Sequence, residues 1–223
     1  MTRPKRWIEI VPIVLLVALW TFFYYRVFFT GHTFVLGDSS RFFYPLWKWG
    51  GDIWNRGLIP LWNPDAGFGT PYLADPQMAA WYPPLRVAYL FLGPVDAFNV
   101  CILFHHLFVL VGFFMFAKGR GFSNSSAFLG AVLFGFSIHA VSLSSDPSIL
   151  LSFSWIPWVF LSADLLFGGS RWGIAVLSVS LAMQMASGYP LLTYLTLLVL
   201  GAEKGLEWFS RSNGAISISR WSG

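Results

Sequence analysis

The chain has 223 residues, of which 56% are hydrophobic and 11% are charged, and its formal net charge is +4. A soluble domain carries about 25% charged residues, so this composition excludes an ordinary water-soluble protein and favours a protein of the lipid bilayer. The positive charge does not indicate nucleic-acid binding, because the basic residues lie at the ends of apolar runs rather than in one patch. The single cysteine, Cys101, excludes an intramolecular disulfide and a cysteine-based metal site.

Six apolar segments follow one another along the chain, and each approaches the length of about 20 residues that a helix needs to cross a bilayer. The first segment begins after a basic N-terminus, and a cleaved signal peptide is its alternative interpretation. The segment is too long for that, and no small-residue cleavage motif follows it. We therefore predict an all-α, polytopic membrane helix bundle with about six spans: 7–29, 97–117, 125–141, 149–167, 172–187 and 191–208.

The basic residues predict the orientation of this bundle. Threading the six spans places nine of the fourteen on the side of the N-terminus: Arg3, Lys5, Arg6, Lys118, Arg120, Arg171, Lys204, Arg211 and Arg220. Since positive residues remain on the cytoplasmic side, we expect a multi-pass protein of the cell membrane with a cytoplasmic N-terminus. The segment 30–95 and Asp146 then lie on the outer face.

Small residues recur every four positions in the third predicted span, at Ala127, Ala131 and Gly135, with His139 next in the series. Such a face lets two helices approach closely. We therefore expect this face, His139 included, to contact a neighbouring helix.

The segment 30–95 is rich in proline and aromatic residues, which indicates a folded outer loop rather than a linker. Residues 40–55 predict an amphipathic helix lying on the membrane, with Ser39 or Ser40 as its cap and Gly57 at its end. Its apolar face carries Phe43, Leu46, Trp47, Ile53 and Trp54, and its charged face carries Arg41, Lys48, Asp52 and Arg56.

Asp38 is the first candidate for chemistry, because it follows the first span at the boundary between lipid and water. A carboxylate there can act as general base on an attacking hydroxyl; a helix-capping role is the alternative. Trp62 and Tyr72 offer aromatic faces for a sugar ring or, alternatively, interfacial anchors. Asp75 and Gln77 supply further polar groups in the same loop.

A divalent cation is a possible cofactor, because Asp38 and Asp146 both lie on the predicted outer side and supply oxygen ligands. Three histidines lie inside predicted spans, and ionisable residues at that depth are functional candidates. Hydrogen bonding between packed helices is the alternative role for His105, His106 and His139.

Several motifs of the outer loop together resemble the first outer loop of the bacterial YfhO-like membrane proteins. They are Gly37-Asp38, Phe43-Tyr44-Pro45, Gly57, Pro60-Leu61-Trp62-Asn63-Pro64, Gly69-Thr70-Pro71, Asp75-Pro76-Gln77 and Tyr82-Pro83-Pro84, followed by Trp155-Ile156-Pro157-Trp158, Gln184, Gly188-Tyr189-Pro190 and Tyr194. The family is similar to the GT-C glycosyltransferases, which use polyprenyl-phosphate sugars on the outer face. Its acidic residue of the first outer loop matches Asp38, and a second-loop acid of some members matches Asp146.

The chain departs from that family in two respects. Family proteins are much longer, so we expect 1–208 to be an N-terminal GT-C-like module and 209–223 a polar tail. A string resembling Gly-His-Pro-Gln in the family reads Gly188-Tyr189-Pro190-Leu191 here.

The resemblance implies sugar transfer from a polyprenyl-phosphate donor to a cell-envelope acceptor. Asp38 is then the base, Arg41 and Arg86 hold phosphate, and Trp62 and Tyr72 frame the sugar. Two alternatives stay open: a transporter or flippase subunit that uses the intramembrane histidines, and an inactive fragment of a longer protein.

Overall fold

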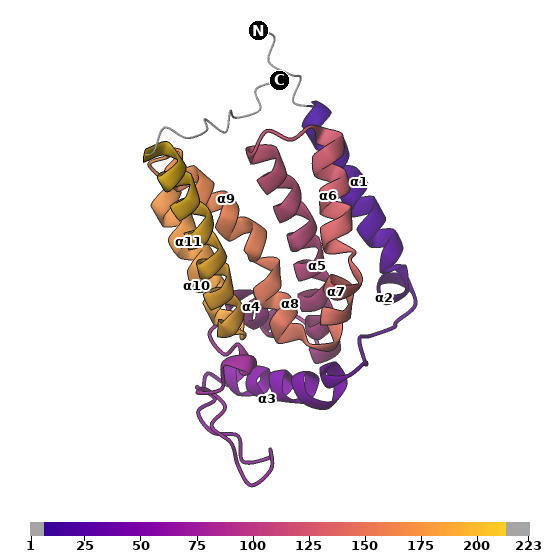
Figure 1. Cartoon of the computed structure of the whole chain (residues 1–223). Helices are drawn as coiled ribbons and strands as arrows, with labels where there is room; N and C mark the ends of the chain where they lie inside the picture. Colours follow the sequence, from indigo (N-terminus) through magenta and orange to yellow (C-terminus); the bar gives the residue numbers. More distant parts are fainter. Residues whose placement is uncertain (1–6, 213–223) are drawn as a thin grey trace.

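The computed structural model describes residues 7–212, and this part of the chain is helical, without a named strand (Figure 1). Its elements are α1 (Trp7–Phe23), α2 (Tyr25–Phe29), the π-helical turn η1 (Ser39–Phe43), α3 (Tyr44–Asn55), the 3₁₀ turn η2 (Pro76–Met78), α4 (Pro83–Phe91), α5 (Pro94–Gly119), α6 (Asn124–Gly135), α7 (Ile138–Ser142), the 3₁₀ turn η3 (Leu143–Ser145), α8 (Pro147–Ser154), α9 (Ile156–Phe167), α10 (Gly173–Ala186) and α11 (Pro190–Ser212). The predicted all-helical class is confirmed for these residues.

Two predictions fall partly outside this range. The basic residues Arg3, Lys5, Arg6 and Arg220 lie outside the described residues, as does most of the predicted tail. The tail was expected to begin at residue 209, but α11 continues to Ser212.

Among the described residues, α5 and the continuous segment Pro147–Phe167 are long and apolar enough to cross a membrane. A third span results if α6 and the following Ile138–Ser145, which are bent by 43° relative to each other, count as one. Two further apolar helices, Ile10–Phe23 and α10, are shorter. The fold is thus compatible with membrane association through two or three spans, and the count of about six stays a prediction.

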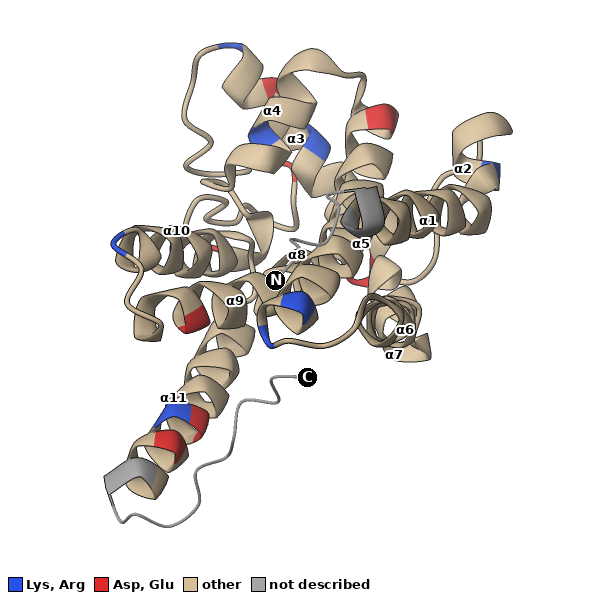
Figure 2. Cartoon of the chain, turned by 90° about the horizontal axis from the view of Figure 1, so that it is seen from above, with Lys and Arg blue, Asp and Glu red and all other residues tan. Residues whose placement is uncertain are grey.

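The long helices run side by side, and α3 lies across one end of them (Figure 1). We call this the loop end. The opposite end, which carries the turns at 120–123 and 168–172, is the turn end. Viewed along the bundle, α1 and α11 lie on opposite sides (Figure 2).

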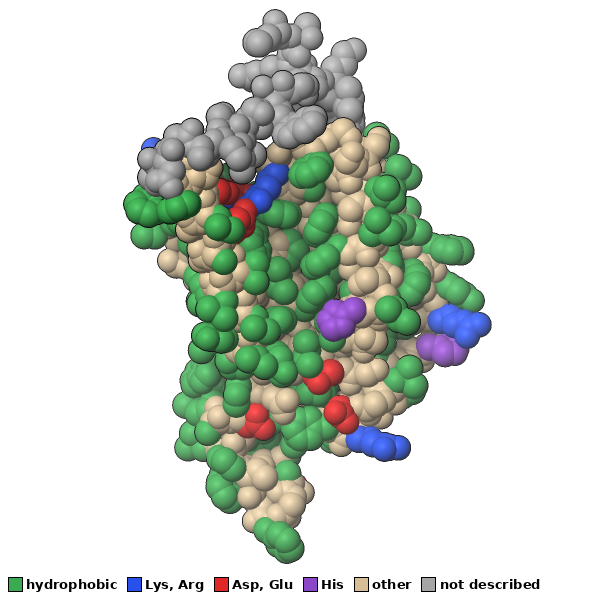
Figure 3. Space-filling model, in the orientation of Figure 1, with side chains coloured by type: hydrophobic (Ala, Val, Ile, Leu, Met, Phe, Trp, Pro, Cys, Tyr) green, Lys and Arg blue, Asp and Glu red, His purple; other side chains and the backbone are tan. Residues whose placement is uncertain are grey.

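On the face shown in Figure 3, hydrophobic side chains dominate the middle, and most of the visible charged groups lie above or below it. Val14 of α1, Leu133 of α6, Val179 of α10 and Leu198 of α11 are all at least half exposed. Soluble monomers rarely expose apolar surface on this scale. A belt of this kind suits contact with lipid chains.

The predicted amphipathic helix of the outer loop is present as η1 and α3, with Pro45 tolerated in the first turn. The chain leaves α3 through Gly57, whose φ of +74° suits glycine. The predicted serine cap is wrong, because Asp38 holds the N-cap position of η1. The most apolar side chains of the helix, Phe43 and Trp47, are buried against the bundle beside Phe98, which fixes the loop to α5.

The small-residue face of α6 packs as expected, but His139 is not part of it. Ala127 and Ala131 are fully buried, and a Cβ at Gly135 would clash with Leu110 of α5. The helix then stops, and Ser137 caps α7 by accepting a hydrogen bond from the Ala140 amide at 3.1 Å. This break ends the fourfold series and leaves His139 exposed. Its ring still contacts Phe153 of α8, so the predicted contact with a neighbouring helix is confirmed.

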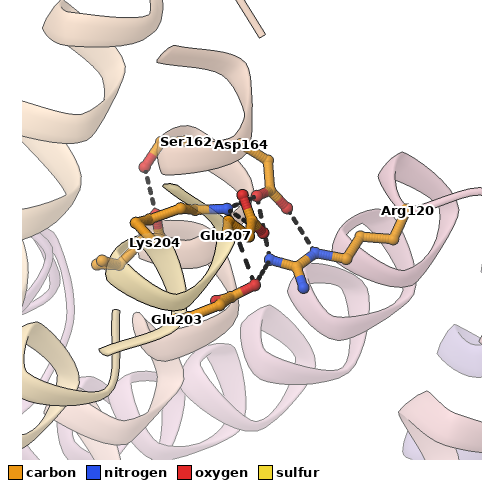
Figure 4. Close-up of polar contacts among 7 residues, drawn as sticks. Arg120, Ser162, Asp164, Glu203, Lys204 and Glu207 are labelled. Atoms are coloured by element: carbon orange, nitrogen blue, oxygen red, sulfur yellow. Dashed lines mark hydrogen bonds and ion pairs between the residues drawn. The ribbon is translucent and has the colours of Figure 1, made fainter. Parts of the chain in front are cut away.

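An ion-pair network joins α9 and α11 to the end of α5 at the turn end (Figure 4). The Arg120 guanidinium donates to both oxygens of Asp164, at 2.7 and 3.0 Å, and also pairs with Glu203 at 2.5 Å. Lys204 donates to Asp164 at 2.8 Å and to Glu207 at 3.2 Å. Asp164 accepts from both cations and is the centre of this network.

Candidate functional site

Asp38 lies at the loop end, immediately before η1, and its side chain is exposed. It occupies the N-cap position, yet its carboxylate accepts no capping hydrogen bond. The geometry therefore leaves the carboxylate oxygens open to water or a ligand. Arg41, three residues further on, is also exposed.

The segment around Asp38 is fastened to the turn before α8. Gly37 has a φ of +58°, and a Cβ there would lie 3.1 Å from the Ser145 side chain. The Ser39 hydroxyl donates a hydrogen bond to the Ser144 carbonyl. Because Asp146 follows this turn directly, Asp38 and Asp146 lie at the same corner of the molecule.

This corner does not form a complete cation site by itself. The Asp146 carboxylate accepts a hydrogen bond from the Ser148 hydroxyl at 3.0 Å. Within residues 7–212, no group of three or more His, Cys, Asp or Glu side chains could hold a metal ion. Asp38 and Asp146 bring two carboxylates to this corner, and a divalent cation there would need water or substrate oxygens as its remaining ligands, so the cation stays a prediction.

Trp62 is held in a rigid hairpin while its side chain stays 56% exposed. Asn63 and Thr70 form an isolated antiparallel bridge through two backbone hydrogen bonds of 2.8 and 2.9 Å. Gly69, at φ +99°, leaves room for the indole, since a Cβ there would lie 2.6 Å from the ring nitrogen. The hairpin thus presents one supported aromatic ring.

An open hollow of about 840 Å³ separates this hairpin from α3. The indole nitrogen of Trp49 donates to the Asp65 carboxylate at 3.1 Å, which ties the two sides together. Polar and aromatic groups meet in the lining, which includes Asp52, Arg56, Trp62 and Asp65. Such a lining suits a polar ligand with an apolar face, as sugars have.

Tyr72 is placed differently from Trp62. Its side chain is 1% exposed, and its ring lies against Gly50 of α3. Burial raises the pKa of Tyr72, and the nearby Arg86 guanidinium offsets part of that rise. The ring face of Tyr72 is therefore not open for sugar stacking in this structure.

Asp75 and Gln77 lie at a contact that the sequence did not reveal. The Asp75 carboxylate accepts a hydrogen bond from the backbone N–H of Gln77 at 2.9 Å and so caps η2. The backbone carbonyl of Gln77 accepts a hydrogen bond from the Trp47 indole at 3.1 Å. Gly188 packs against the same turn: at φ +113°, its added Cβ would lie 3.0 Å from the Pro76 carbonyl oxygen. Two motifs quoted for the resemblance thus touch each other.

The intramembrane histidines His105 and His106 are buried and hydrogen-bonded. Because a carbonyl only accepts, His105 Nδ1 donates to the Cys101 carbonyl at 2.5 Å, and Nε2 then accepts from the Tyr82 hydroxyl at 2.7 Å. The Trp155 indole donates to the same hydroxyl oxygen at 2.8 Å. His106 Nε2 pairs with the Ser144 hydroxyl at 2.9 Å. Both rings therefore join packed elements.

The chain matches no protein-family model, no curated protein and no solved structure. The class of protein is therefore defined by the fold of the described residues alone. It is an all-helical chain with two or three helices suited to a membrane and a folded, aromatic-rich loop across one end.

Proposed function

We propose that this chain is the membrane module of a glycosyltransferase related to the YfhO-like and GT-C proteins. In this proposal about six helices span the membrane, the loop end faces outward, and the N-terminus is cytoplasmic. The substrates are a polyprenyl-phosphate sugar in the bilayer and a hydroxyl-bearing acceptor of the cell envelope. The observation that carries the proposal is the exposed Asp38 carboxylate, which makes no capping bond and lies in the segment that joins the first apolar helix to η1.

The proposed chemistry needs one base and one phosphate-binding cation. The Asp38 carboxylate takes the proton of the acceptor hydroxyl as its oxygen attacks the anomeric carbon. The bond from that carbon to the phosphate oxygen breaks, and polyprenyl phosphate leaves with the electron pair. Arg41, one turn of η1 away, binds the departing phosphate. Trp62, at the hollow beside the later half of α3, supports a ring of the acceptor that is distant from the reacting hydroxyl.

The buried histidines favour this proposal over transport. A proton relay needs a ring that can gain a proton and pass it on. Both nitrogens of His105 are already paired with Tyr82 and the Cys101 carbonyl. His139 is exposed on the helical surface rather than placed along an internal path.

The test is transfer of radiolabelled sugar from a polyprenyl-phosphate donor to envelope material, in membranes with matched protein levels. We expect Asp38→Asn to lower the rate by about 10²–10⁴-fold, the range for loss of a general base. Asparagine keeps the size and the capping ability of aspartate, so loss of transfer separates the catalytic role from the capping role.

Asp96→Asn is the matched control, because Asp96 is an exposed acid at the same end, in the first turn of α5. It should change transfer by no more than about twofold, as exposed substitutions usually do. Near-normal transfer by the Asp38→Asn protein would remove the catalytic assignment.

A further inference from the structure

The Arg86 guanidinium, on α4, is buried without an acceptor. Its Nε, Nη1 and Nη2 atoms are inaccessible to solvent and make no hydrogen bond of normal length and angle. The residue as a whole is only half-buried, so the inaccessible part is the charged head. An arginine near a membrane surface ordinarily does the reverse, burying its stem and leaving its head in water. The head of Arg86 is turned inward.

Two phenol hydroxyls lie near this head. The hydroxyls of Tyr72 and Tyr89 are buried and make no hydrogen bond of normal length and angle, and the Arg86 guanidinium is close enough to act electrostatically on both. Tyr72 lies against Gly50 and Tyr89 against Gly51, where an added Cβ would come within 3 Å of either ring. The two glycines of α3 thus seat both tyrosine rings close against that helix.

The described part of the chain supplies no counter-ion for Arg86. No ion pair within 4 Å involves it, and the cation–π contacts occur at Arg26, Arg120, Arg171 and Lys204 instead. The carboxylate of Asp75, which acts electrostatically on Tyr72, is engaged in capping η2. A buried charge without a partner strongly destabilises a fold. The arrangement of a cation among donors is therefore complementary to an anion from outside the chain.

We propose that Arg86, with the Tyr72 and Tyr89 hydroxyls, forms a binding site for a phosphate group between α3 and α4. A guanidinium binds two phosphate oxygens at once. The hydroxyl of Tyr72 or of Tyr89 can donate a hydrogen bond to a remaining phosphate oxygen. Gly50 lies twelve residues beyond Asp38, or about 18 Å along a helix. The site is thus separate from the corner that holds Asp38, so Arg86 lies too far from that carboxylate to share the donor phosphate with Arg41 in the way that the resemblance implies, and the site does not depend on sugar transfer.

The site is tested by thermal unfolding of the purified chain in a maltoside detergent free of phosphate. The two probes are inorganic phosphate and dodecyl phosphate, which carries the same group on an alkyl chain. At about 100 times its Kd, a bound probe should raise the Tm by about 5–10 °C. A response to both probes indicates a soluble phosphate ligand, and a response to dodecyl phosphate alone indicates a lipid phosphate. No response to either probe would overturn the proposal.

Arg86→Met removes the charge and keeps the length of the side chain. Its Tm without phosphate should equal or exceed that of the wild type, because an unpaired buried cation is gone, and neither probe should raise it. Arg26→Met is the matched control, since the Arg26 guanidinium is exposed; it should respond as the wild type does. An Arg86→Met protein that responds equally well would exclude the site.

Two milder variants keep the test decisive if Arg86→Met does not fold. Tyr72→Phe and Tyr89→Phe retain the rings that pack on α3 and remove one donor each, so each should weaken the Kd about tenfold. Full wild-type affinity in both variants would exclude the site. Asp38→Asn should leave the Tm response intact, which distinguishes failure of this site from failure of the proposed enzyme.

Discussion

Gly188 lies where two segments far apart in the sequence meet. It separates α10 from α11, has a φ of +113°, and approaches the Pro76 carbonyl and the Ser148 side chain. A residue with a Cβ is strained at this φ, and here the Cβ would also be crowded by backbone. The absence of a side chain at one position therefore decides how closely the outer loop can approach the helices.

Gly188→Ala should destabilise the protein by about 1–3 kcal/mol, through backbone strain and the close contact with Pro76. Thermal or chemical unfolding in detergent measures the effect. Gly201→Ala is the matched control: Gly201 is inside α11 with open space around it, so alanine should be neutral or stabilise by up to about 1 kcal/mol. Equal stability of the two variants would show that the contact with the outer loop is unimportant.

At the scale of the helices, α11 is held by polar contacts at two levels. Near the loop end, the Gln184 amide of α10 donates to the Thr196 hydroxyl at 3.0 Å and to the Ser152 carbonyl at 3.3 Å. At the turn end, Lys204 and Glu203 join Asp164 and Arg120. Where lipid surrounds a bundle, such contacts orient helices that apolar packing alone distinguishes poorly.

Asp164→Asn tests the contacts of α11 at the turn end. The carboxylate is 24% exposed and accepts from both Arg120 and Lys204, so loss of its charge should cost about 1–2 kcal/mol after allowance for solvent screening. Glu207→Gln is the control, because Glu207 forms its one ion pair among the described residues with Lys204 and is 37% exposed; its effect should stay within about 0.5 kcal/mol. An unfolding experiment that ranks Glu207→Gln as the more harmful change would contradict the network as the anchor of α11.

At the scale of the whole molecule, the loop end and the turn end differ in the segments and charged residues that they carry. The outer loop with α3 covers one end, and the turns that carry Arg120 and Arg171 form the other (Figures 1 and 2). Apolar surface lies between them (Figure 3). A membrane that surrounds this belt would place the two ends in different compartments.

Cysteine labelling on intact cells tests that arrangement. Single cysteines replace Thr70 in the outer loop and Ser170 in the turn between α9 and α10, in a Cys101→Ala background; Cys101 is itself buried. A membrane-impermeant thiol reagent should label position 70 and reach position 170 only after the membrane is opened. Labelling of position 170 alone on intact cells would invert the proposed orientation, and labelling of both would contradict a spanning bundle.

The sequence by itself determined the helical class, the amphipathic helix across the end of the bundle and the small-residue face of α6. These features follow from the spacing of apolar and small residues, which is a local property of each segment. The sequence also indicated Asp38, because its position after an apolar run is visible without a structure. The folded loop at 30–95 could likewise be predicted, because its richness in proline and aromatic residues is visible in the sequence.

Only the tertiary structure decided which side chains meet. The break at Ser137 removes His139 from the packed face, and Tyr72 is buried on Gly50 rather than open to a sugar. The contact of Gly188 with Pro76 and the unpaired head of Arg86 depend on how distant segments are packed. A periodic pattern reports that a residue faces inward, but the partner it finds there, or lacks, is set by the three-dimensional arrangement of the helices.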